Sequence, residues 1–288
     1  SKDNRSEAIN SETINKLKLP GVRHIIAVGS GKGGVGKSTV SSNLALALQA
    51  AGHTVGLLDA DIYGPSQGLM MGVASGTKPE VTENAIMPVM ANGVQCMSMS
   101  FVASDRTPAV WRGPMASGAL QQLISQTYWQ NVDYLIVDMP PGTGDIQLTL
   151  SQNTALAGAV IVTTPQDIAL LDARKAIEMF LKVEVPILGV VENMSTHVCS
   201  QCGHEEAIFG EGGGLSISEE YQIDLLGKLP LSLSVRQQSD GGKPTVISEP
   251  DGAAAQSFRD IAAKVDEKMS ELTNSAGNQG PKIQILDD

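Results

Sequence analysis

The sequence predicts an α/β fold in which a mostly parallel β-sheet is flanked by helices on both faces. Apolar residues form short continuous runs, without the alternation of a half-exposed strand, at residues 24–28, 54–59, 132–138, 159–163 and 186–191. Such runs are typical of strands that are covered on both faces. Helical patterns occupy residues 40–51, 113–129, 167–183 and 249–272. Strands that alternate with helices in this way indicate a parallel sheet.

A single large domain is expected, since 288 residues with 42% hydrophobic composition can bury a substantial core. We expect a flexible N-terminal arm over residues 1–20, a domain over residues 21–273 and a disordered tail over residues 274–288. The arm is polar, and the tail is rich in Gly, Asn, Pro and acidic residues. Asn92-Gly93 lies between two apolar runs and predicts a β-hairpin.

Charge and composition narrow the possible partners. The formal net charge is −11, which argues against nonspecific attraction to nucleic acid or to anionic membranes. No apolar run approaches the roughly 20 residues of a membrane span, and the N-terminus does not resemble a signal peptide. Three cysteines are too few for a disulfide framework in a chain of this length. We therefore expect a cytoplasmic protein that binds neither nucleic acid nor membrane.

A glycine-rich phosphate-binding loop lies between the first predicted strand and the helix after it. Glycines bring backbone N–H groups close to phosphate oxygens, and the following helix adds its N-terminal amides. In this spacing Lys37 reaches the terminal phosphates and the Ser38 hydroxyl binds Mg²⁺. The implied ligand is a nucleoside triphosphate, held by Gly31, Lys32, Gly33, Gly34, Val35, Gly36, Lys37, Ser38 and Thr39.

Acidic residues follow two other predicted strands, where open α/β sheets bind their ligands. Asp59 and Asp61 come after one strand and Asp138 ends another, so we expect three carboxylates to converge on the phosphate site. Mg²⁺ would offset their mutual repulsion, with Asp138 holding a metal-bound water. Gly142 and Gly144 would let the next loop sense the terminal phosphate. Asn193, after a later strand, either hydrogen-bonds an adenine edge or caps a turn.

The pair Cys199 and Cys202 has three interpretations: a dithiol redox centre, zinc ligands or iron-sulfur ligands. The nearby His197 and His204 favour a metal over pure redox chemistry, whereas Cys96 lies in a predicted strand and is expected to be a buried, inert thiol. The chain has no second pair of this kind. Two copies meeting about a two-fold axis would supply four thiolates, enough for one cluster or one zinc ion.

Lys32 is not required by a general phosphate-binding loop, and with it the loop resembles that of the deviant Walker A P-loop NTPases, which include MinD, ParA and the nitrogenase iron protein. The resemblance implies a dimer in which Lys32 crosses to the partner's nucleotide, so Lys32, Lys37 and Asp61 are the expected catalytic residues. It also implies that Asp61 orients the attacking water, that Asp59 supports the outer coordination of Mg²⁺, and that Asn193 contacts adenine. The expected cofactors are ATP and Mg²⁺.

Five motifs, together with Cys199 and Cys202, carry a closer resemblance. They are residues 31–38 (GKGGVGKS), 57–66 (LLDADIYGPS), 111–115 (WRGPM), 138–145 (DMPPGTGD) and 191–195 (VENMS). With them the chain, over about residues 20–270, resembles the Mrp/ApbC family of iron-sulfur cluster carrier ATPases. That resemblance implies a homodimer in which Cys199 and Cys202 bind a labile 4Fe-4S cluster for delivery to apo-proteins, with acceptor and scaffold proteins as partners. Bacterial relatives often carry a small domain before the loop, for which residues 1–20 are too short.

Three other functions remain open at this point. A positioning ATPase like MinD or ParA would share the loop, Asp61 and Asn193, but it does not explain Cys199 and Cys202. An electron donor like the nitrogenase iron protein has its cluster cysteines far apart in sequence. A dimer joined by a structural zinc ion is compatible with the cysteine pair and with the nearby His197 and His204.

Overall fold

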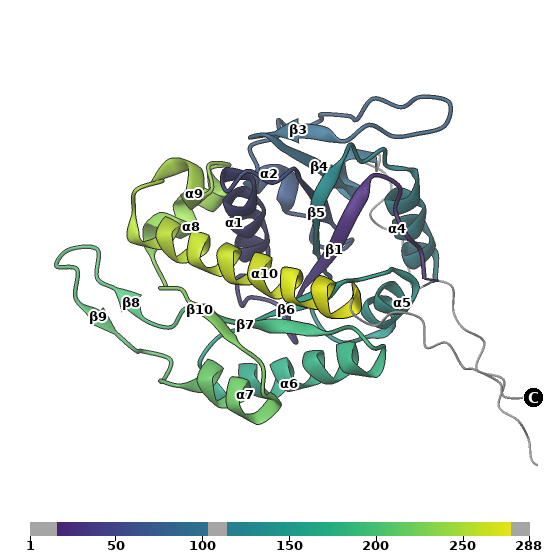
Figure 1. Cartoon of the computed structure of the whole chain (residues 1–288). Helices are drawn as coiled ribbons and strands as arrows, with labels where there is room; N and C mark the ends of the chain where they lie inside the picture. The colour runs from purple at the N-terminus through teal and green to yellow at the C-terminus, as the bar shows by residue number, and fades with distance from the viewer. Residues whose placement is uncertain (1–15, 103–113, 278–288) are drawn as a thin grey trace, which may run out of the picture.

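The centre of the molecule is an eight-stranded sheet in a computed structural model that describes residues 16–102 and 114–277 (Figure 1). The strand order is β10-β7-β6-β1-β5-β2-β4-β3, and every neighbouring pair is parallel except β3 with β4. These strands are β1 (Val22–Gly29), β2 (Val55–Asp59), β3 (Val89–Ala91), β4 (Val94–Ser98), β5 (Val132–Asp138), β6 (Gly158–Thr163), β7 (Ile187–Glu192) and β10 (Leu225–Lys228).

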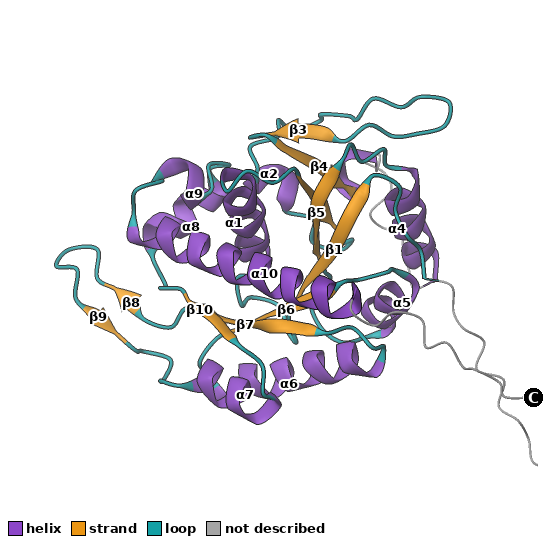
Figure 2. Cartoon of the chain, in the orientation of Figure 1, coloured by secondary structure: helices purple, strands orange, loops and turns teal. Residues whose placement is uncertain are grey.

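Helices cover both faces of this sheet (Figure 2). One face carries α1 (Lys37–Ala50) and α10 (Ala253–Gly277), beside the shorter α2 (Gln67–Met70), α8 (Leu233–Asp240) and α9 (Thr245–Ser248). The other face carries α4 (Pro114–Gln126), α5 (Asp145–Asn153), α6 (Asp167–Lys182) and α7 (Gly213–Tyr221), and α3 (Met99–Val102) follows β4. The predicted α/β architecture is confirmed.

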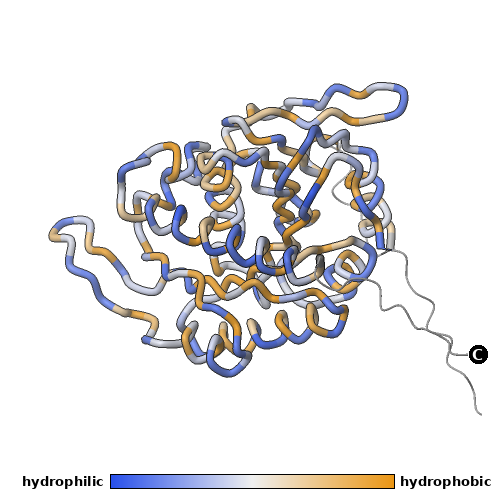
Figure 3. The backbone as a smooth tube through the Cα atoms, in the orientation of Figure 1, coloured by the Kyte–Doolittle hydropathy of each residue, from blue (hydrophilic) through white to orange (hydrophobic). Residues whose placement is uncertain are grey.

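The core lies where the sequence is continuously apolar. Every residue of β2 and of β6 is buried, and the central strands are mainly hydrophobic along their length (Figure 3). Helix α1 is buried from Val40 to Leu48 because it lies between the sheet and α10. An alanine- and leucine-rich helix suits that position, since small side chains allow close packing and leucines fill the remaining space.

The five predicted strands and the hairpin at Asn92-Gly93 are present, with ends shifted by one or two residues. Helix α4 ends at Gln126 instead of residue 129. Helix α10 begins at Ala253 instead of residue 249, because Pro250 and Gly252 interrupt the helical pattern. It continues to Gly277, so the first four residues of the expected tail, 274–277, are helical. Strand β10 was not predicted, because its four residues include Gly227 and are ordered as a strand by pairing with β7.

The expected flexible arm is wrong for residues 16–20, which pack against the domain. Leu17 N–H donates to the Asn153 carbonyl at 2.7 Å, and Leu19 is buried in the core. Residues 1–15 and 278–288, and the Trp111-Arg112-Gly113 part of the family motif, lie outside the described residues. No helix in the described part of the chain is long and apolar enough to cross a membrane.

Candidate nucleotide and metal site

The carboxyl ends of the parallel strands bring the predicted site residues to one edge of the sheet. The glycine-rich loop follows β1, and the acidic residues follow β2 and β5. Asp59 pairs directly with Asp138 in the register of these two strands. Asn193 and the cysteine segment follow β7. Residues far apart in the sequence therefore meet here because parallel strands end on the same side.

The glycines of the loop are needed for its shape. Gly34 and Gly36 have φ angles of 81° and 84°, in the left-handed region that side chains rarely adopt. A Cβ on Gly31 would lie 1.9 Å from the Asp172 carbonyl oxygen, and one on Gly36 would lie 2.2 Å from Asn193 Nδ2. The loop is therefore packed against α6 on one side and against the end of β7 on the other.

A cavity of about 210 Å³ lies against this loop. Its wall combines the loop with Asp61 and with Pro141 from the segment after β5. Asp59 and Asp138 are fully buried and do not line it. The lining residues are Ser30, Lys32, Gly33, Gly34, Gly36, Lys37, Ser38, Thr39, Asp61, Ser66, Met70 and Pro141. Of the three carboxylates expected to converge, only Asp61 therefore faces this cavity.

Asp138 is held by three side-chain donors from two helices, α1 and α2. Its Oδ1 lies 2.5 Å from Lys37 Nζ and accepts from Ser41 Oγ at 3.0 Å. Its Oδ2 accepts from Gln67 Nε2 at 2.9 Å, and the same amide nitrogen donates to the Ser38 carbonyl at 2.8 Å. Sequence reasoning missed Ser41 and Gln67. Ser41 lies one helical turn after Lys37, a spacing that places both on one face of α1, whereas nothing in the sequence points to Gln67.

Asp59 is a buried carboxylate whose negative charge is opposed by backbone donors. Burial raises its pKa, and the neighbouring Asp138 raises the pKa further, while N–H groups of Gln67, Asp61 and Ser66 counteract the rise. The Ser66 and Gln67 amides donate to Oδ2 at 2.8 and 2.9 Å. Asp59 thus fixes the start of α2, which places Gln67 against Asp138.

Asp61 and Lys32 are the more accessible members of the site. Both side chains are half-buried and line the cavity. Asp61 Oδ1 accepts from the Gly64 N–H at 3.1 Å, and the Lys32 carbonyl accepts from Ser30 Oγ at 2.8 Å. Hydrogen bonds therefore hold the Asp61 carboxylate and the backbone of Lys32 in place, and both residues line the cavity.

The segment after β5 lies against the phosphate-binding loop. Gly142, with a φ of 95°, donates its N–H to the Ser30 carbonyl at 2.9 Å. Gln147 Nε2, from the first turns of α5, donates to the Pro141 carbonyl at 2.6 Å. The loop that was predicted to sense a phosphate is thus in direct contact with the loop that was predicted to hold it.

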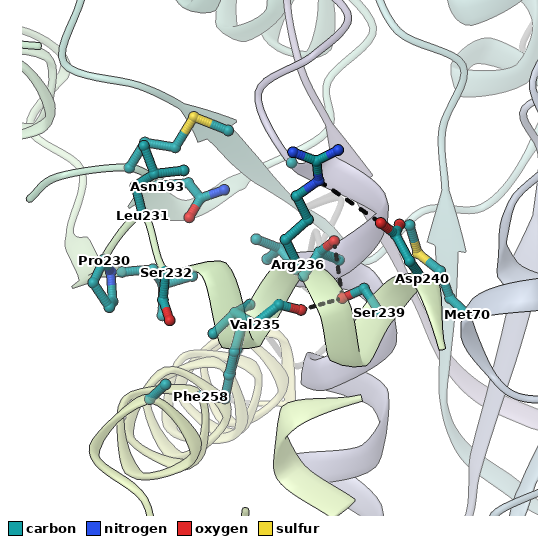
Figure 4. Close-up of a pocket in the computed structure, with 16 residues that line it drawn as sticks. Met70, Asn193, Pro230, Leu231, Ser232, Val235, Arg236, Ser239, Asp240 and Phe258 are labelled. Carbon is teal, nitrogen blue, oxygen red and sulfur yellow. Dashed lines mark hydrogen bonds and ion pairs between the residues drawn. The ribbon is translucent and has the colours of Figure 1, made fainter. Parts of the chain in front are cut away.

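A second cavity, of about 160 Å³, lies beside the first and shares Gly36, Thr39 and Met70 with it (Figure 4). Its wall is mostly apolar and comes from the segment after β7, the segment after β10, α8 and α10. The lining residues that the two cavities do not share are Val40, Asn193, Met194, Leu229, Pro230, Leu231, Ser232, Val235, Arg236, Ser239, Asp240, Ala254 and Phe258. Apart from Asn193 and its neighbour Met194 in the motif at residues 191–195, sequence reasoning did not find these unshared residues, because they come from segments without a motif.

Asn193 joins this second cavity to the phosphate-binding loop. Its Nδ2 donates to the Val35 carbonyl at 2.9 Å, and its own N–H donates to the Thr163 carbonyl at 2.8 Å. The first contact orients the side-chain amide, so that Oδ1 is the atom left to accept from a ligand.

The cysteine pair lies at the tip of a two-stranded hairpin formed by β8 (His197–Val198) and β9 (Glu205–Glu206), where a loop was expected. The Cys199 N–H donates to the His204 carbonyl at 2.9 Å and the Gly203 N–H donates to the Cys199 carbonyl at 2.8 Å. Hydrogen bonds from the Gln201 and Cys202 N–H groups and from the Cys202 thiol lower the pKa of Cys199.

Cys199 is half-exposed and Cys202 is exposed. Within residues 16–102 and 114–277, no group of three or more His, Cys, Asp or Glu side chains is placed to hold a metal ion. His197 and His204 are both exposed and do not complete such a group with the thiols. Cys96 is buried in β4, as predicted, and burial raises its pKa to about 12.

A glycine-rich loop between β1 and α1, with its lysine paired to the aspartate that ends β5, defines a P-loop NTPase. The sheet around it has the fold of MinD and ParA. The chain belongs to the ParA family of NUBPL iron-transfer P-loop NTPases, whose model matches residues 21–266.

Relatives by sequence carry names that agree with this family. The iron-sulfur cluster carrier protein of Pseudomonas fragi is 58% identical, over 86% of this chain and 88% of its own. That of Escherichia coli strain K12 is 54% identical, over 89% and 70% of the two chains. The mouse iron-sulfur cluster transfer protein NUBPL is 47% identical, over 93% and 84%.

Solved structures agree with the fold. A nucleotide-binding protein from Archaeoglobus fulgidus, in complex with ADP and with cobalt found in it, superposes with a TM-score of 0.70 at 35% identity, covering 81% of this chain and 90% of the other. The cell division ATPase MinD of Pyrococcus furiosus superposes with a TM-score of 0.66 at 24% identity, covering 85% and 98%.

Proposed function

We propose that this chain is an ATP-hydrolysing carrier that, as a homodimer, binds a labile 4Fe-4S cluster and transfers it to apo-proteins. The observation that carries the proposal is the hairpin tip, where Cys199 and Cys202 lie close together and accessible without a third metal-binding side chain from the described residues. The names of the relatives support an iron-sulfur cluster as the cargo, without giving its type.

A site with two thiols is half of a four-ligand cluster site. A lowered pKa at Cys199 favours the thiolate, which is the form that binds metal. Two hairpins related by a two-fold axis supply four thiolates, the ligand set of a 4Fe-4S cluster. An accessible site held by two subunits also suits a cargo that must leave, since each subunit gives up only two bonds when the dimer opens.

The surface beside the phosphate-binding loop supports a dimer. Ile168 and Leu171, on the first turns of α6, are 63% and 57% exposed. Their helix touches the loop, because the Asp172 carbonyl leaves no room for a side chain at Gly31. Contiguous exposed apolar patches mark interaction surfaces, and we propose that these two residues belong to such a patch. A second copy at this surface would bring its Lys32 toward the first copy's cavity.

The nucleotide site provides the groups that phosphoryl transfer to water needs. Lys37 lines the cavity and is the cation for a terminal phosphate, for which it must exchange its contact with Asp138. Asp61 faces the same cavity and is placed to orient a water molecule. The Ser38 hydroxyl and the Asp138 carboxylate are hard oxygen donors of the type that Mg²⁺ prefers, and Asp59 lies behind them. A bound Mg²⁺ supplies positive charge that neutralises the phosphates.

The neighbouring cavity fits an adenine ring. Its wall is mostly apolar, and the free Oδ1 of Asn193 is an acceptor. Adenine presents a donor amino group at the position where guanine presents an acceptor oxygen. The geometry therefore favours ATP over GTP.

Anaerobic reconstitution with iron and sulfide, followed by metal analysis and transfer to an apo-protein that needs a 4Fe-4S cluster, tests the carrier function. We expect about one cluster per two chains, as four thiolates per cluster require. Cys199→Ala should abolish it, and the matched control Cys96→Ala should keep it, because Cys96 is buried in β4. A colourless protein that holds only zinc and passes no iron to the acceptor would contradict the proposal.

A further inference from the structure

The second cavity and the cysteine hairpin share a wall. This wall is the segment over residues 229–232, here named the wall segment, which follows β10. It lines the cavity on one side and is hydrogen-bonded to the stem of the hairpin on the other. We propose that the base of the bound nucleotide, and not its phosphates, holds the hairpin in place by filling this cavity. The inference rests on the proposed nucleotide binding, and it adds the route by which the nucleotide acts on the thiols.

Backbone hydrogen bonds join the wall segment to residues 192–198, which lead from the end of β7 into the hairpin. These two paired segments are here named the ladder. They continue the parallel pairing of β7 with β10 beyond the end of the sheet. The bonds run from Leu229 N–H to the Glu192 carbonyl (2.8 Å), from Ser195 N–H to the Leu229 carbonyl (2.9 Å), from Leu231 N–H to the Thr196 carbonyl (2.6 Å) and from Val198 N–H to the Leu231 carbonyl (3.3 Å). Cys199 directly follows Val198, so the ladder ends at the tip of the hairpin that carries the two cysteines.

The same two segments also form part of the cavity wall, although on the hairpin side different residues line the cavity. Leu229, Pro230, Leu231 and Ser232 line it from the wall segment, while Asn193 and Met194 line it from the segment that leads to the hairpin. Figure 4 shows Asn193 and Leu231 beside each other in its wall. A ring bound there contacts both sides of the ladder. It therefore fixes their separation, and with it the direction in which the hairpin leaves the sheet.

One side of the ladder is rigid. Glu192 is buried, and its carboxylate accepts from Ser195 Oγ at 2.7 Å and from the Gly214 N–H at 2.6 Å. Met194, which lies between Glu192 and Ser195 in the sequence, has a φ of 55°, a conformation that is uncommon for residues other than glycine. Tight anchoring on this side leaves the wall segment as the part that can respond to a ligand.

The hairpin depends on this attachment. Its strands have two residues each, and an isolated two-stranded ribbon is marginally stable at best. By contrast, among the described residues the phosphate cavity is lined neither by the ladder nor by the wall segment. Phosphates alone therefore have no direct contact through which to order the hairpin. ADP and ATP should both order it, and the thiols should be least restrained when no base is bound.

The test compares ADP with tripolyphosphate, which has phosphates but no base, on the full-length chain freed of metal under reducing, anaerobic conditions. Calorimetry establishes the concentration at which each ligand saturates the site. The alkylation rates of Cys199 and Cys202 and the hydrogen exchange of the hairpin amides are then measured. We expect ADP to slow alkylation and hydrogen exchange by about threefold or more, because a bound ligand suppresses local opening. Tripolyphosphate should leave both rates unchanged.

Equal slowing by tripolyphosphate, or binding of ADP without any change in the hairpin, overturns the inference and leaves the proposed function standing. Absence of ADP binding overturns both. Val198→Pro provides a matched variant, because it removes the N–H that donates to Leu231 and leaves the wall of the base cavity intact. It should bind ADP normally and lose the slowing, whereas Val198→Thr, which keeps the N–H, should behave as the wild type. If ADP still slows alkylation and hydrogen exchange in Val198→Pro, the ladder does not transmit the effect of the base. If this variant fails to fold, the comparison of ADP with tripolyphosphate on the wild type tests the inference by itself.

Discussion

Lys37 Nζ lies 2.5 Å from Asp138 Oδ1, with only 6% and 0% of the two side chains exposed. The contact joins the first residue of α1 to the last residue of β5, 101 positions apart in the sequence. It makes the cation that is proposed to bind phosphate also the counter-ion of a buried carboxylate. Lys37 therefore links the stability of the fold to the proposed catalysis.

Lys37→Met is expected to destabilise the protein by about 3 kcal/mol, because Asp138 would keep its Ser41 and Gln67 donors but lose the cation that it pairs with among the described residues. Urea unfolding measures the change. The double variant Lys37→Met/Asp138→Asn should recover much of the loss, since position 138 then no longer carries a charge that lacks its cation. A single variant as stable as the wild type would show that the pair contributes little.

Lys32→Ala should leave unfolding within about 0.5 kcal/mol of the wild type, because the side chain is half-buried at the surface of the cavity. ATP hydrolysis should fall by about a hundredfold or more, as for other cations supplied by a partner. Asp61→Asn should also be inactive. Mixing the two variants should restore activity, because the Asp61→Asn subunit supplies Lys32 to an intact Asp61 site. A mixture that stays inactive would argue against action across the dimer.

Two glycines of the loop provide a matched pair. Gly31→Ala should destabilise the protein by more than about 2 kcal/mol, because its Cβ would lie 1.9 Å from the backbone oxygen of Asp172. Gly33→Ala meets nothing within 4 Å, so its stability should be unchanged. Any loss of nucleotide binding in Gly33→Ala would then mean that the added methyl group occupies space that the phosphate needs. Similar thermal unfolding of both variants would contradict the packing of the loop on α6.

Asn193→Ala is expected to weaken ADP binding by about tenfold, since it removes the proposed contact to adenine and the Val35 hydrogen bond that orients the amide. Tripolyphosphate binding should change much less, because the phosphate cavity is formed by other residues. Calorimetric titration with both ligands checks this. An equal loss for both would mean that Asn193 acts by shaping the loop at Gly36.

The three cysteines should differ sharply in reactivity in the metal-free protein. Burial raises the pKa of Cys96 to about 12, so this thiol should resist alkylation at pH 8 until the protein unfolds. Hydrogen bonds lower the pKa of Cys199, so its alkylation rate should reach half-maximum at a lower pH than that of the same thiol in urea. Peptide mass spectrometry over a pH series measures both. A Cys96 that reacts at the rate of Cys199 would contradict the buried position.

Much of the fold followed from local patterns. Continuous apolar runs predicted the buried strands, and Asn92-Gly93 predicted the hairpin, because both depend on residues adjacent in sequence. Strand β10 and the hairpin of β8 and β9 were missed, since their short segments have no strong periodicity and are ordered by partners distant in the chain.

The glycine-rich loop, the acids that end two strands and the cysteine pair could be located from the sequence alone, because their spacing is itself the chemical signal. Only the tertiary structure decided which of them meet. It placed Asp61 at the first cavity and Asp138 behind it, added Gln67 as a donor, and joined the second cavity to the cysteine hairpin through residues 229–232. The reason is physical: a motif is read along the chain, whereas burial, hydrogen-bond partners and shared walls arise only when distant segments pack together.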